Sequence, residues 1–231
     1  MERVVEPELL DVLPPRDGSA LRSRRDIRRL NALMGHTRMA ARLIEETLRG
    51  CAGRRVVELG AGDGHFLLSV AERMRAAGRD VEATLVDRLD VLGSGVRDRF
   101  DGLGWRIRTE TMDATEWLRG AVPDSAGVVV SNLFLHQFQA DALTEMLRLA
   151  ARTTRAMIAL EPRRGWLPRF CGRFLWAAGC GLVTRHDGRA SIRAGFTGRE
   201  LSVLWPDAAN WDLTEGPAGL FTHLFIARRK D

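Results

Sequence analysis

Three glycines at alternate positions follow an apolar run in the stretch VVELGAGDGHF. Glycine takes positive φ readily, and its lack of a side chain lets a ligand approach the peptide groups closely. The spacing is G-x-G-x-G through Gly60, Gly62 and Gly64, whereas a dinucleotide-binding loop has G-x-G-x-x-G and holds a pyrophosphate at the helix that follows. Glu58 and Asp63 place negative charge at the loop, which disfavours a pyrophosphate. The stretch therefore predicts a site for a cationic ligand, and the alternative is a tight turn.

Strands and helices that alternate along the chain would position this loop. Apolar runs bounded by turn residues predict strands near residues 55–59, 81–86, 105–108, 127–131, 156–161, 210–214 and 220–227, and helices near 65–77, 91–100 and 140–151. The last helix carries Leu143, Met146 and Leu147 on one apolar face. This alternation predicts an α/β fold with a mainly parallel, doubly wound sheet. Ligands of such sheets bind at the carboxyl ends of the strands.

Two segments lie outside the predicted core. Residues 1–50 form an extension that looks helical from Ser23 onward, and its basic run RSRRDIRR is typical of a solvated helix face with Ile27 and Leu30 on the buried side. Residues 163–200 form a long insertion after the fifth strand, and such insertions are often lids. We expect one domain with a helical N-terminal cap at 1–50, a cofactor-binding core at 51–162, a lid at 163–200 and C-terminal strands at 201–231.

Over about residues 56–227 the chain resembles the class I S-adenosylmethionine-dependent methyltransferases of the small-molecule type. The first motif of that family is E/D-x-G-x-G-x-G, which matches the run from Glu58 through Ala61 to Gly64. The resemblance implies a Rossmann-like, seven-stranded, mainly parallel sheet whose antiparallel last strand lies between the fifth and sixth. It also implies S-adenosylmethionine as the cofactor and S-adenosylhomocysteine as its product.

The resemblance further implies which acidic residues bind that cofactor. Asp87 in TLVDR, with Arg88 beside it, matches the family's second motif, in which a carboxylate at a strand end accepts hydrogen bonds from both ribose hydroxyls. Asp113, with Ala114, in TMDATEWL matches the third motif, which contacts the adenine amino group. Each aspartate alone could be a helix cap. In this order, each after a predicted strand, they favour a cofactor site.

In that family the residue that ends the fourth strand faces the methyl donor, and VVVSNLFLHQF places Asn132 there. Family members that methylate amino groups of nucleobases have Asp or Asn followed by Pro-Pro-aromatic, whereas Leu133 and Phe134 follow here. The pattern N-x-x-L-H resembles instead the O- and C-methylating enzymes of small molecules. We therefore predict a small, apolar, aromatic, phenolic or polyketide-like acceptor, with O-methylation preferred and C-methylation second.

His136 in the same stretch has three interpretations. It could be a general base that removes a proton from a phenol or enol, since an unperturbed imidazole with a pKa near ~6.5 is mostly neutral at pH 7. It could orient an acceptor oxygen, or it could be structural and cap the helix expected to begin near Ala140. A base is not obligatory, because alignment of acceptor and sulfonium methyl can alone supply roughly 7–11 kcal/mol. All three interpretations stay open.

Other residues are weaker candidates for the site. Glu161, at the end of the fifth predicted strand, and His186, next to Asp187, are candidates for acid or base chemistry, and the alternative for the adjacent pair is a polar turn. Met34 and Arg38 in the cap are candidate contacts of the cofactor. The remaining histidines are predicted to be structural: His36, His65 and His223.

The predicted lid begins with an aromatic stripe. Trp166, Phe170 and Phe174 follow one another at i, i+4 and i+8, and two arginines lie on another face, which predicts one amphipathic helix. Its apolar face could pack on the sheet, form the wall of an apolar substrate pocket, or contact a membrane surface through residues 165–183. The arginines exclude a membrane-spanning helix.

Composition limits the remaining classes of function. The 231 residues carry a formal net charge of +5, but with one lysine the excess of arginine is spread along the chain, so we expect no nucleic-acid partner. Cys51, Cys171 and Cys180 fit no metal-ligand spacing, which predicts reduced thiols and no metal. The absence of a long apolar segment and of a signal-peptide pattern predicts a cytoplasmic protein.

Two alternative functions stay open, an RNA or protein methyltransferase and a non-catalytic cofactor-binding protein. The oligomeric state is not predicted.

Overall fold

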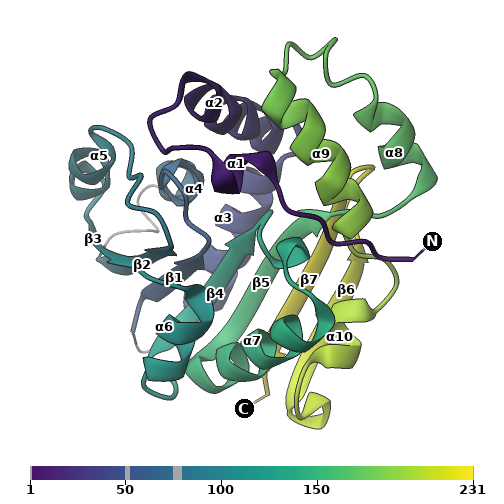
Figure 1. Ribbon diagram of the computed structural model, residues 1–231. Coiled ribbons are helices and arrows are strands. Elements are labelled where there is room, and N and C mark those ends of the chain that lie inside the picture. The colour runs from purple at the N-terminus through teal and green to yellow at the C-terminus, as the bar shows by residue number, and fades with distance from the viewer. Residues whose placement is uncertain (1, 50–52, 75–79, 231) are drawn as a thin grey trace.

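The computed structural model describes residues 2–49, 53–74 and 80–230, and its centre is a seven-stranded sheet in the order β3-β2-β1-β4-β5-β7-β6 (Figure 1). The first five strands pair in parallel, whereas β7 pairs antiparallel with both β5 and β6. This arrangement confirms the predicted sheet and the place of its last strand. The strands are β1 (Arg55–Leu59), β2 (Val81–Asp87), β3 (Trp105–Thr111), β4 (Ala126–Asn132), β5 (Thr154–Pro162), β6 (Trp211–Pro217) and β7 (Thr222–Arg229).

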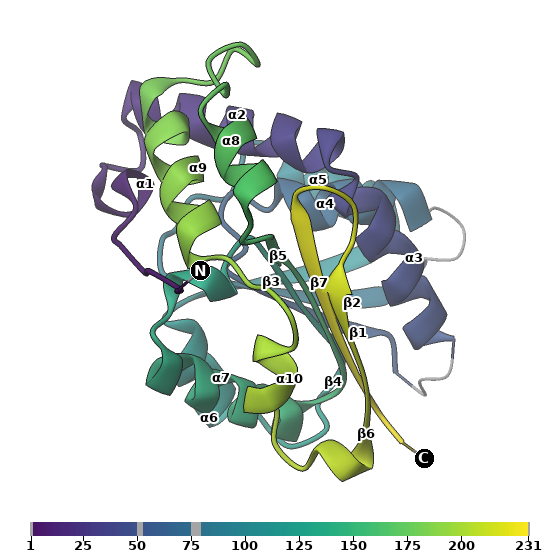
Figure 2. The same ribbon diagram turned by 90° about the vertical axis from the view of Figure 1, so that its right-hand side faces the viewer.

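Helices cover both faces of the sheet (Figure 2). One face packs against α3 (His36–Leu48), α4 (His65–Met74) and α5 (Val96–Gly102), and the other against α6 (Ala114–Gly120), α7 (Ala140–Thr153) and α10 (Glu200–Leu204). Every residue of β4 is buried, as expected for a central strand between two helical layers. The helix predicted at 91–100 begins only at Val96, because Gly95 precedes it with a φ of 70°. Cys51 and the predicted end of α4 lie outside the described residues.

A third group of helices lies beyond the carboxyl ends of the parallel strands (Figure 1). It comprises α1 (Leu9–Val12) and α2 (Gly18–Leu33) from the N-terminal segment, and α8 (Trp166–Gly172) and α9 (Leu182–Ala194) from the insertion. The α8 helix is shorter than the aromatic stripe predicted, because it ends at Gly172, before Phe174. Gly172 lets α9 approach closely, since a Cβ there would lie 2.9 Å from Ile192 of that helix. The polar turn considered for His186 and Asp187 is wrong, because both lie inside α9. The described residues also include the 3₁₀ turns η2 (Leu135–Gln137) and η3 (Ala208–Asn210).

The α2 helix presents a polar face to the lid. Asp26 is buried, and its Oδ2 accepts hydrogen bonds from the backbone N–H of Gly181 (2.8 Å) and from Oγ1 of Thr184 (3.0 Å). Gly181 is the N-cap of α9 and Thr184 lies in its first turn, so Asp26 is bonded at the N-terminal end of that helix, where backbone N–H groups have no partner within the helix. The prediction that Ile27 and Leu30 form the buried side of α2 was therefore incomplete, because these two residues are only partly buried and line a cavity.

We expect Asp26→Ala to lower the free energy of unfolding by about 1–3 kcal/mol, because it removes the acceptor of the Gly181 N–H ahead of α9 and one of the two partners of the Thr184 hydroxyl. Urea unfolding followed by circular dichroism measures the change. Asp212→Ala, which removes an exposed carboxylate from β6, is the matched control and should change stability by less than ~0.5 kcal/mol. Equal effects of the two substitutions would contradict a structural role for Asp26.

Candidate active site

A cavity of about 820 Å³ lies between the carboxyl edge of the sheet and the helices of the cap and lid. This volume is within the range of about 300–1,000 Å³ typical of small-molecule sites. Residues at the ends of β1, β2 and β4 line one part of it, and α1, α2, α8 and α9 line the rest. Nine of the ten residues predicted to bind the cofactor lie in the lining: Glu58, Gly60, Ala61, Gly62, Asp87, Arg88, Asp113, Ala114 and Asn132.

The three glycines of the loop after β1 serve different purposes. Gly60 has a φ of 71°, and a Cβ there would lie 2.3 Å from the ring of Phe134. Gly62 has a φ of 54° and nothing within 4 Å of an added Cβ, so its bare backbone faces the cavity. Gly64 lies outside the lining, because it packs against Leu92. The backbone around Gly62 is therefore the part of the loop that a ligand can approach.

Two aspartates are fixed at the cavity by backbone hydrogen bonds. Asp87, the last residue of β2, accepts from the N–H of Gly62 (2.8 Å) and from that of Leu89 (2.9 Å). Asp113 is the N-cap of α6, and its Oδ1 accepts from the N–H groups of Thr115 (2.8 Å) and Glu116 (3.2 Å). The helix-cap interpretation of Asp113 thus holds together with its position in the lining. Both carboxylates retain lone pairs for hydroxyl or amino donors of a ligand.

Glu58 carries an unpartnered oxygen at the cavity. Its side chain is buried, it lines the cavity, and its Oε2 has no hydrogen-bond partner among the described residues. Burial, followed by repulsion from Asp63 and Asp87, raises the pKa of the Glu58 carboxyl well above its usual value. A cationic ligand beside this oxygen would supply the missing partner and favour the ionised carboxylate. The carboxylate oxygens of Glu58, Asp87 and Asp113 therefore form a set of acceptors that fits a cationic group together with hydroxyls.

Asn132, the last residue of β4, is held by the cap. Its Oδ1 lies 2.7 Å from Nδ1 of His36, and its Nδ2 donates to Oδ1 of Asn31 at 3.2 Å. Burial lowers the pKa of His36, so the ring is neutral, with Nδ1–H donating to Asn132 and Nε2 accepting from Oγ1 of Thr222 at 2.7 Å. His36 thus orients Asn132 and joins the cap to β4 and β7.

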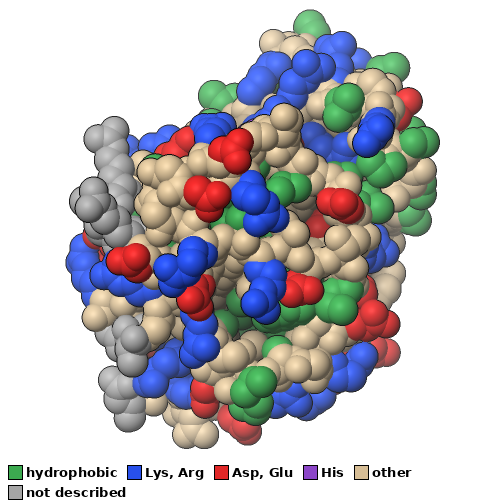
Figure 3. Space-filling view, turned by 90° about the vertical axis from the view of Figure 1, so that its left-hand side faces the viewer, with side chains coloured by type: hydrophobic (Ala, Val, Ile, Leu, Met, Phe, Trp, Pro, Cys, Tyr) green, Lys and Arg blue, Asp and Glu red, His purple; other side chains and the backbone are tan. Residues whose placement is uncertain are grey.

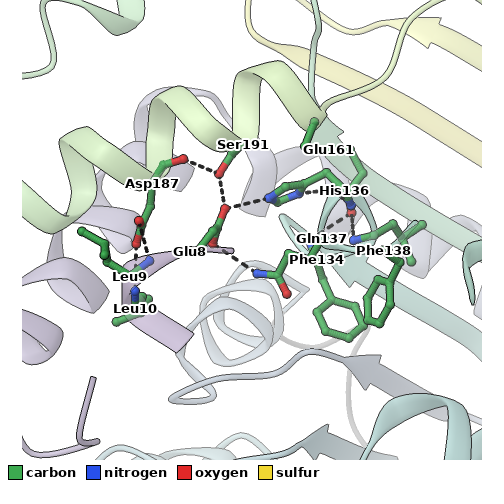
Figure 4. Close-up of polar contacts among 12 residues, drawn as sticks. Glu8, Leu9, Leu10, Phe134, His136, Gln137, Phe138, Glu161, Asp187 and Ser191 are labelled. Carbon is green, nitrogen blue, oxygen red and sulfur yellow. Dashed lines mark hydrogen bonds and ion pairs between the residues drawn. The ribbon is translucent and has the colours of Figure 1, made fainter. Parts of the chain in front are cut away.

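His136 lies between two carboxylates (Figure 4). Its Nδ1 is 2.8 Å from Oε2 of Glu161, and its Nε2 is 3.1 Å from Oε1 of Glu8. Burial alone would lower the pKa of this ring, but the hydrogen bonds and charges of Glu161 and Glu8 outweigh it and raise the pKa to about 9. The ring is therefore an imidazolium at neutral pH, with both N–H groups donating. The expectation of a neutral imidazole at pH 7 is wrong, and His136 in this state cannot accept a proton.

Glu161 acts on the turn after β4. It is fully buried and lies outside the cavity lining. Its Oε1 accepts from Oγ of Ser131 (3.2 Å) and from the N–H groups of Phe134 (3.1 Å) and Leu135 (2.9 Å). The same turn holds Leu133 at a φ of 54°, a conformation that residues other than glycine seldom adopt. The position of Glu161 favours a positioning role over contact with a ligand.

The first residues of the chain close one side of the cavity. This segment, residues 2–12, is called the strap below, and its Glu8, Leu10 and Asp11 line the cavity. The N–H groups of Leu9 and Leu10 donate to the carboxylate of Asp187 at 2.8 and 3.0 Å, while Glu8 contacts His136 (Figure 4). Sequence reasoning missed the strap. No motif in the sequence marks Glu8 as the partner of a residue so far along the chain.

The remaining candidates divide between the cavity and the surface. Met34 lines the cavity, whereas Arg38 does not. His186 also lies outside the lining, because its half-exposed ring bonds to Asp187 at 3.0 Å. The structure therefore does not bring His186 to the predicted site.

Across residues 2–49, 53–74 and 80–230, no group of three or more His, Cys, Asp or Glu side chains is arranged to hold a metal ion.

Comparisons with known proteins identify the fold. No family model and no curated protein matches the sequence. Among solved structures, an O-methyltransferase family protein from Burkholderia thailandensis has a TM-score of 0.60 at 18% identity, over 94% of this chain and 62% of that chain. The 1,6-didemethyltoxoflavin-N1-methyltransferase from the same organism was solved with bound 1,6-didemethyltoxoflavin and S-adenosylhomocysteine. It has a TM-score of 0.58 at 20% identity, over 99% of this chain and 94% of that chain. The chain has the class I methyltransferase fold.

A third structure with this methyltransferase fold is the plantazolicin methyltransferase BamL in complex with a triazolic desmethylPZN analog and S-adenosylhomocysteine. It has a TM-score of 0.66 at 11% identity, over 96% of this chain and 93% of that chain. The chain spans less than two thirds of the O-methyltransferases among these structures, 62% of the Burkholderia protein and 56% of one from Nostoc punctiforme.

In the part of the chain that is described, no helix is long and apolar enough to cross a membrane.

The raised pKa of His136 predicts a pH dependence of stability for this methyltransferase fold. The pKa is about 9 in the folded state against 6.5 for a free histidine, so the imidazolium stabilises the fold fully below pH 6.5 and less as the pH rises through 9. Between these limits we expect the unfolding free energy of the wild type to fall by on the order of 3 kcal/mol more than that of His136→Gln.

Urea titrations of both proteins at several pH values measure this difference. His186→Gln, which replaces a half-exposed histidine, should keep the wild-type profile. Parallel profiles of the wild type and His136→Gln would contradict a buried imidazolium.

Proposed function

We propose that this chain transfers a methyl group from S-adenosylmethionine to a small, apolar acceptor, with a phenolic or enolic oxygen as the first choice of acceptor atom and carbon as the second. One observation carries the proposal. The carboxyl ends of β1, β2 and β3 bring Glu58, Asp87 and Asp113 to a single cavity, beside the bare backbone of Gly62. This set offers hydrogen-bond acceptors for a ribose, an amino group and a cation.

Each residue of the set suits a different part of the cofactor. Asp87 would accept hydrogen bonds from the ribose hydroxyls, and Oδ2 of Asp113 from the adenine amino group. The unpartnered Oε2 of Glu58 would attract the cationic methionine end, while Gly62 leaves room for it along the peptide groups. When bound, the cofactor supplies a methyl group that its sulfonium makes electrophilic.

The rest of the cavity suits an apolar acceptor. Side chains from the cap, the turn after β4 and the lid line it, including Ile27, Met34, Phe138, Leu175 and Ile192. Such a lining excludes water and orients a ring or chain beside the methyl group, so alignment supplies much of the catalysis. The proposal assigns no general base, since His136 is protonated and bonded to two carboxylates. Complexes of similar folds with didemethyltoxoflavin and with a desmethylPZN analog support a small-molecule acceptor.

We expect Asp87→Ala to weaken the binding of S-adenosylhomocysteine at least tenfold, because it removes the acceptor for the ribose and loosens Gly62. Isothermal titration calorimetry measures the affinity. The matched control is Asp90→Ala, an exposed aspartate in the loop that follows β2, which should bind as the wild type does. Unchanged affinity of a folded Asp87→Ala protein would remove the ribose assignment.

The acceptor class is tested with methyl-labelled S-adenosylmethionine and separate panels of apolar phenols, enols and carbon acids, with RNA and protein as further arms. We expect label in a phenol or enol and none in RNA. Label in RNA that disappears at high salt would indicate a macromolecular substrate. Cofactor binding without transfer to any arm would indicate a non-catalytic protein.

A further inference from the structure

The largest exposed apolar side chains of the lid gather in one short stretch. This stretch, residues 166–182, is called the lid edge below. Trp166 is 75% exposed, Trp176 58%, Phe170 53% and Phe174 47%, and Leu182 at the start of α9 is 78% exposed. Soluble surfaces seldom hold so many apolar side chains together without a partner.

The lid edge is also cationic. Arg169 and Arg173 are exposed among its aromatic residues, and the sequence has no acidic residue between Glu161 and Asp187. Aromatic and basic side chains therefore share this surface with no carboxylate of the same segment to neutralise it.

A second row of arginines lies beside the lid edge. Arg22, Arg25 and Arg29 are exposed on one side of α2. The first and last of them donate hydrogen bonds to carbonyl oxygens of the lid edge, those of Gly179 (3.3 Å) and Ala178 (2.6 Å). Figure 3 shows basic side chains gathered at the upper end of the molecule, the end at which Figure 1 places α2 and the connection between α8 and α9.

We infer that the lid edge and the arginine side of α2 together dock on an anionic lipid bilayer. Tryptophan and phenylalanine enter the interfacial region of a bilayer, where their apolar rings leave water. Arginines beside them are attracted by anionic headgroups. The α8 helix, Trp166–Gly172, is far too short to span a bilayer and is suited to lie on its surface. The protruding apolar side chains favour a bilayer over RNA, whose phosphate backbone offers them no apolar environment.

The inner side of the same segment connects the docking surface to the cavity. Pro168, Cys171 and Leu175 line the cavity, while Phe170 and Trp176 of the same stretch are exposed. Docking would thus place one wall of the cavity at the membrane surface, where apolar small molecules partition. The inference goes beyond the proposed function, and its test uses the protein without cofactor or acceptor.

The test is co-sedimentation of the full chain with vesicles of phosphatidylcholine alone or mixed with phosphatidylglycerol. We expect binding to the mixed vesicles that weakens with salt. The double variant Phe170→Ser/Trp176→Ser should bind at least tenfold more weakly. The affinity of Arg25→Ala/Arg173→Ala for the mixed vesicles should be about 25-fold lower at low salt, because each arginine near an anionic surface contributes roughly a fivefold factor to that affinity.

Matched controls remove the same residue types elsewhere. Val122→Ser/Val203→Ser replaces two exposed apolar residues, and Arg108→Ala/Arg199→Ala two exposed arginines, none of them in the lid edge or α2. Both controls should bind vesicles as the wild type does, and circular dichroism should show that all four variants are folded.

Four outcomes would overturn the inference. The first is that the wild type does not sediment with anionic vesicles. The second is that Phe170→Ser/Trp176→Ser and Arg25→Ala/Arg173→Ala are folded and bind vesicles as the controls do. The third is a dimer in solution that Phe170→Ser/Trp176→Ser dissociates, without vesicle binding, which would assign the surface to a second copy of the chain. The fourth is RNA binding that competes with the vesicles, which would assign the arginines to nucleic acid instead.

Discussion

The buried imidazolium of His136 is the interaction on which the arrangement of the site depends. A charge without access to water is costly unless carboxylates and hydrogen bonds compensate it, and Glu161 and Glu8 provide both. Glu161 holds the turn after β4 at the same time. Glu8 brings in the strap, whose helix α1 has no buried residue of its own. The strap is therefore held by polar contacts rather than by apolar burial.

The topology of the sheet explains why the candidate cofactor residues lie together. Parallel strands end at one edge, so the residues at the carboxyl ends of β1, β2 and β3 meet there although they are separated in sequence. The cap and lid complete the cavity from the other side, and they meet through the buried carboxylate of Asp26. One half of the cavity thus rests on the rigid sheet, and the other half on helices held together by polar contacts.

The parts of this architecture that depend on local sequence could be predicted. Apolar runs and the glycine loop indicated the strands, and Glu58 and Asp87 were expected at strand ends because each closes an apolar run. The contact between Glu8 and His136 could not be predicted, since it joins residues 128 positions apart. The protonation of His136 follows from its contacts with both Glu161 and Glu8, which only the folded chain brings together. The polar turn considered for His186 and Asp187 was wrong because Gly188, which follows them, lies inside α9. A Cβ at Gly188 would lie 2.8 Å from Leu175, so this glycine allows α9 to pack closely against that side chain.

The strap gives the cavity a route of exchange that leaves the core intact. Its contacts with Asp187 and His136 can break while every strand keeps its hydrogen bonds, because the strap pairs with no strand of the sheet. Local opening of this kind requires far less free energy than global unfolding. The release of a bulky ligand can then be limited by the lifetime of the hydrogen bonds of the strap, and the residence time of that ligand would be set there and not by the sheet.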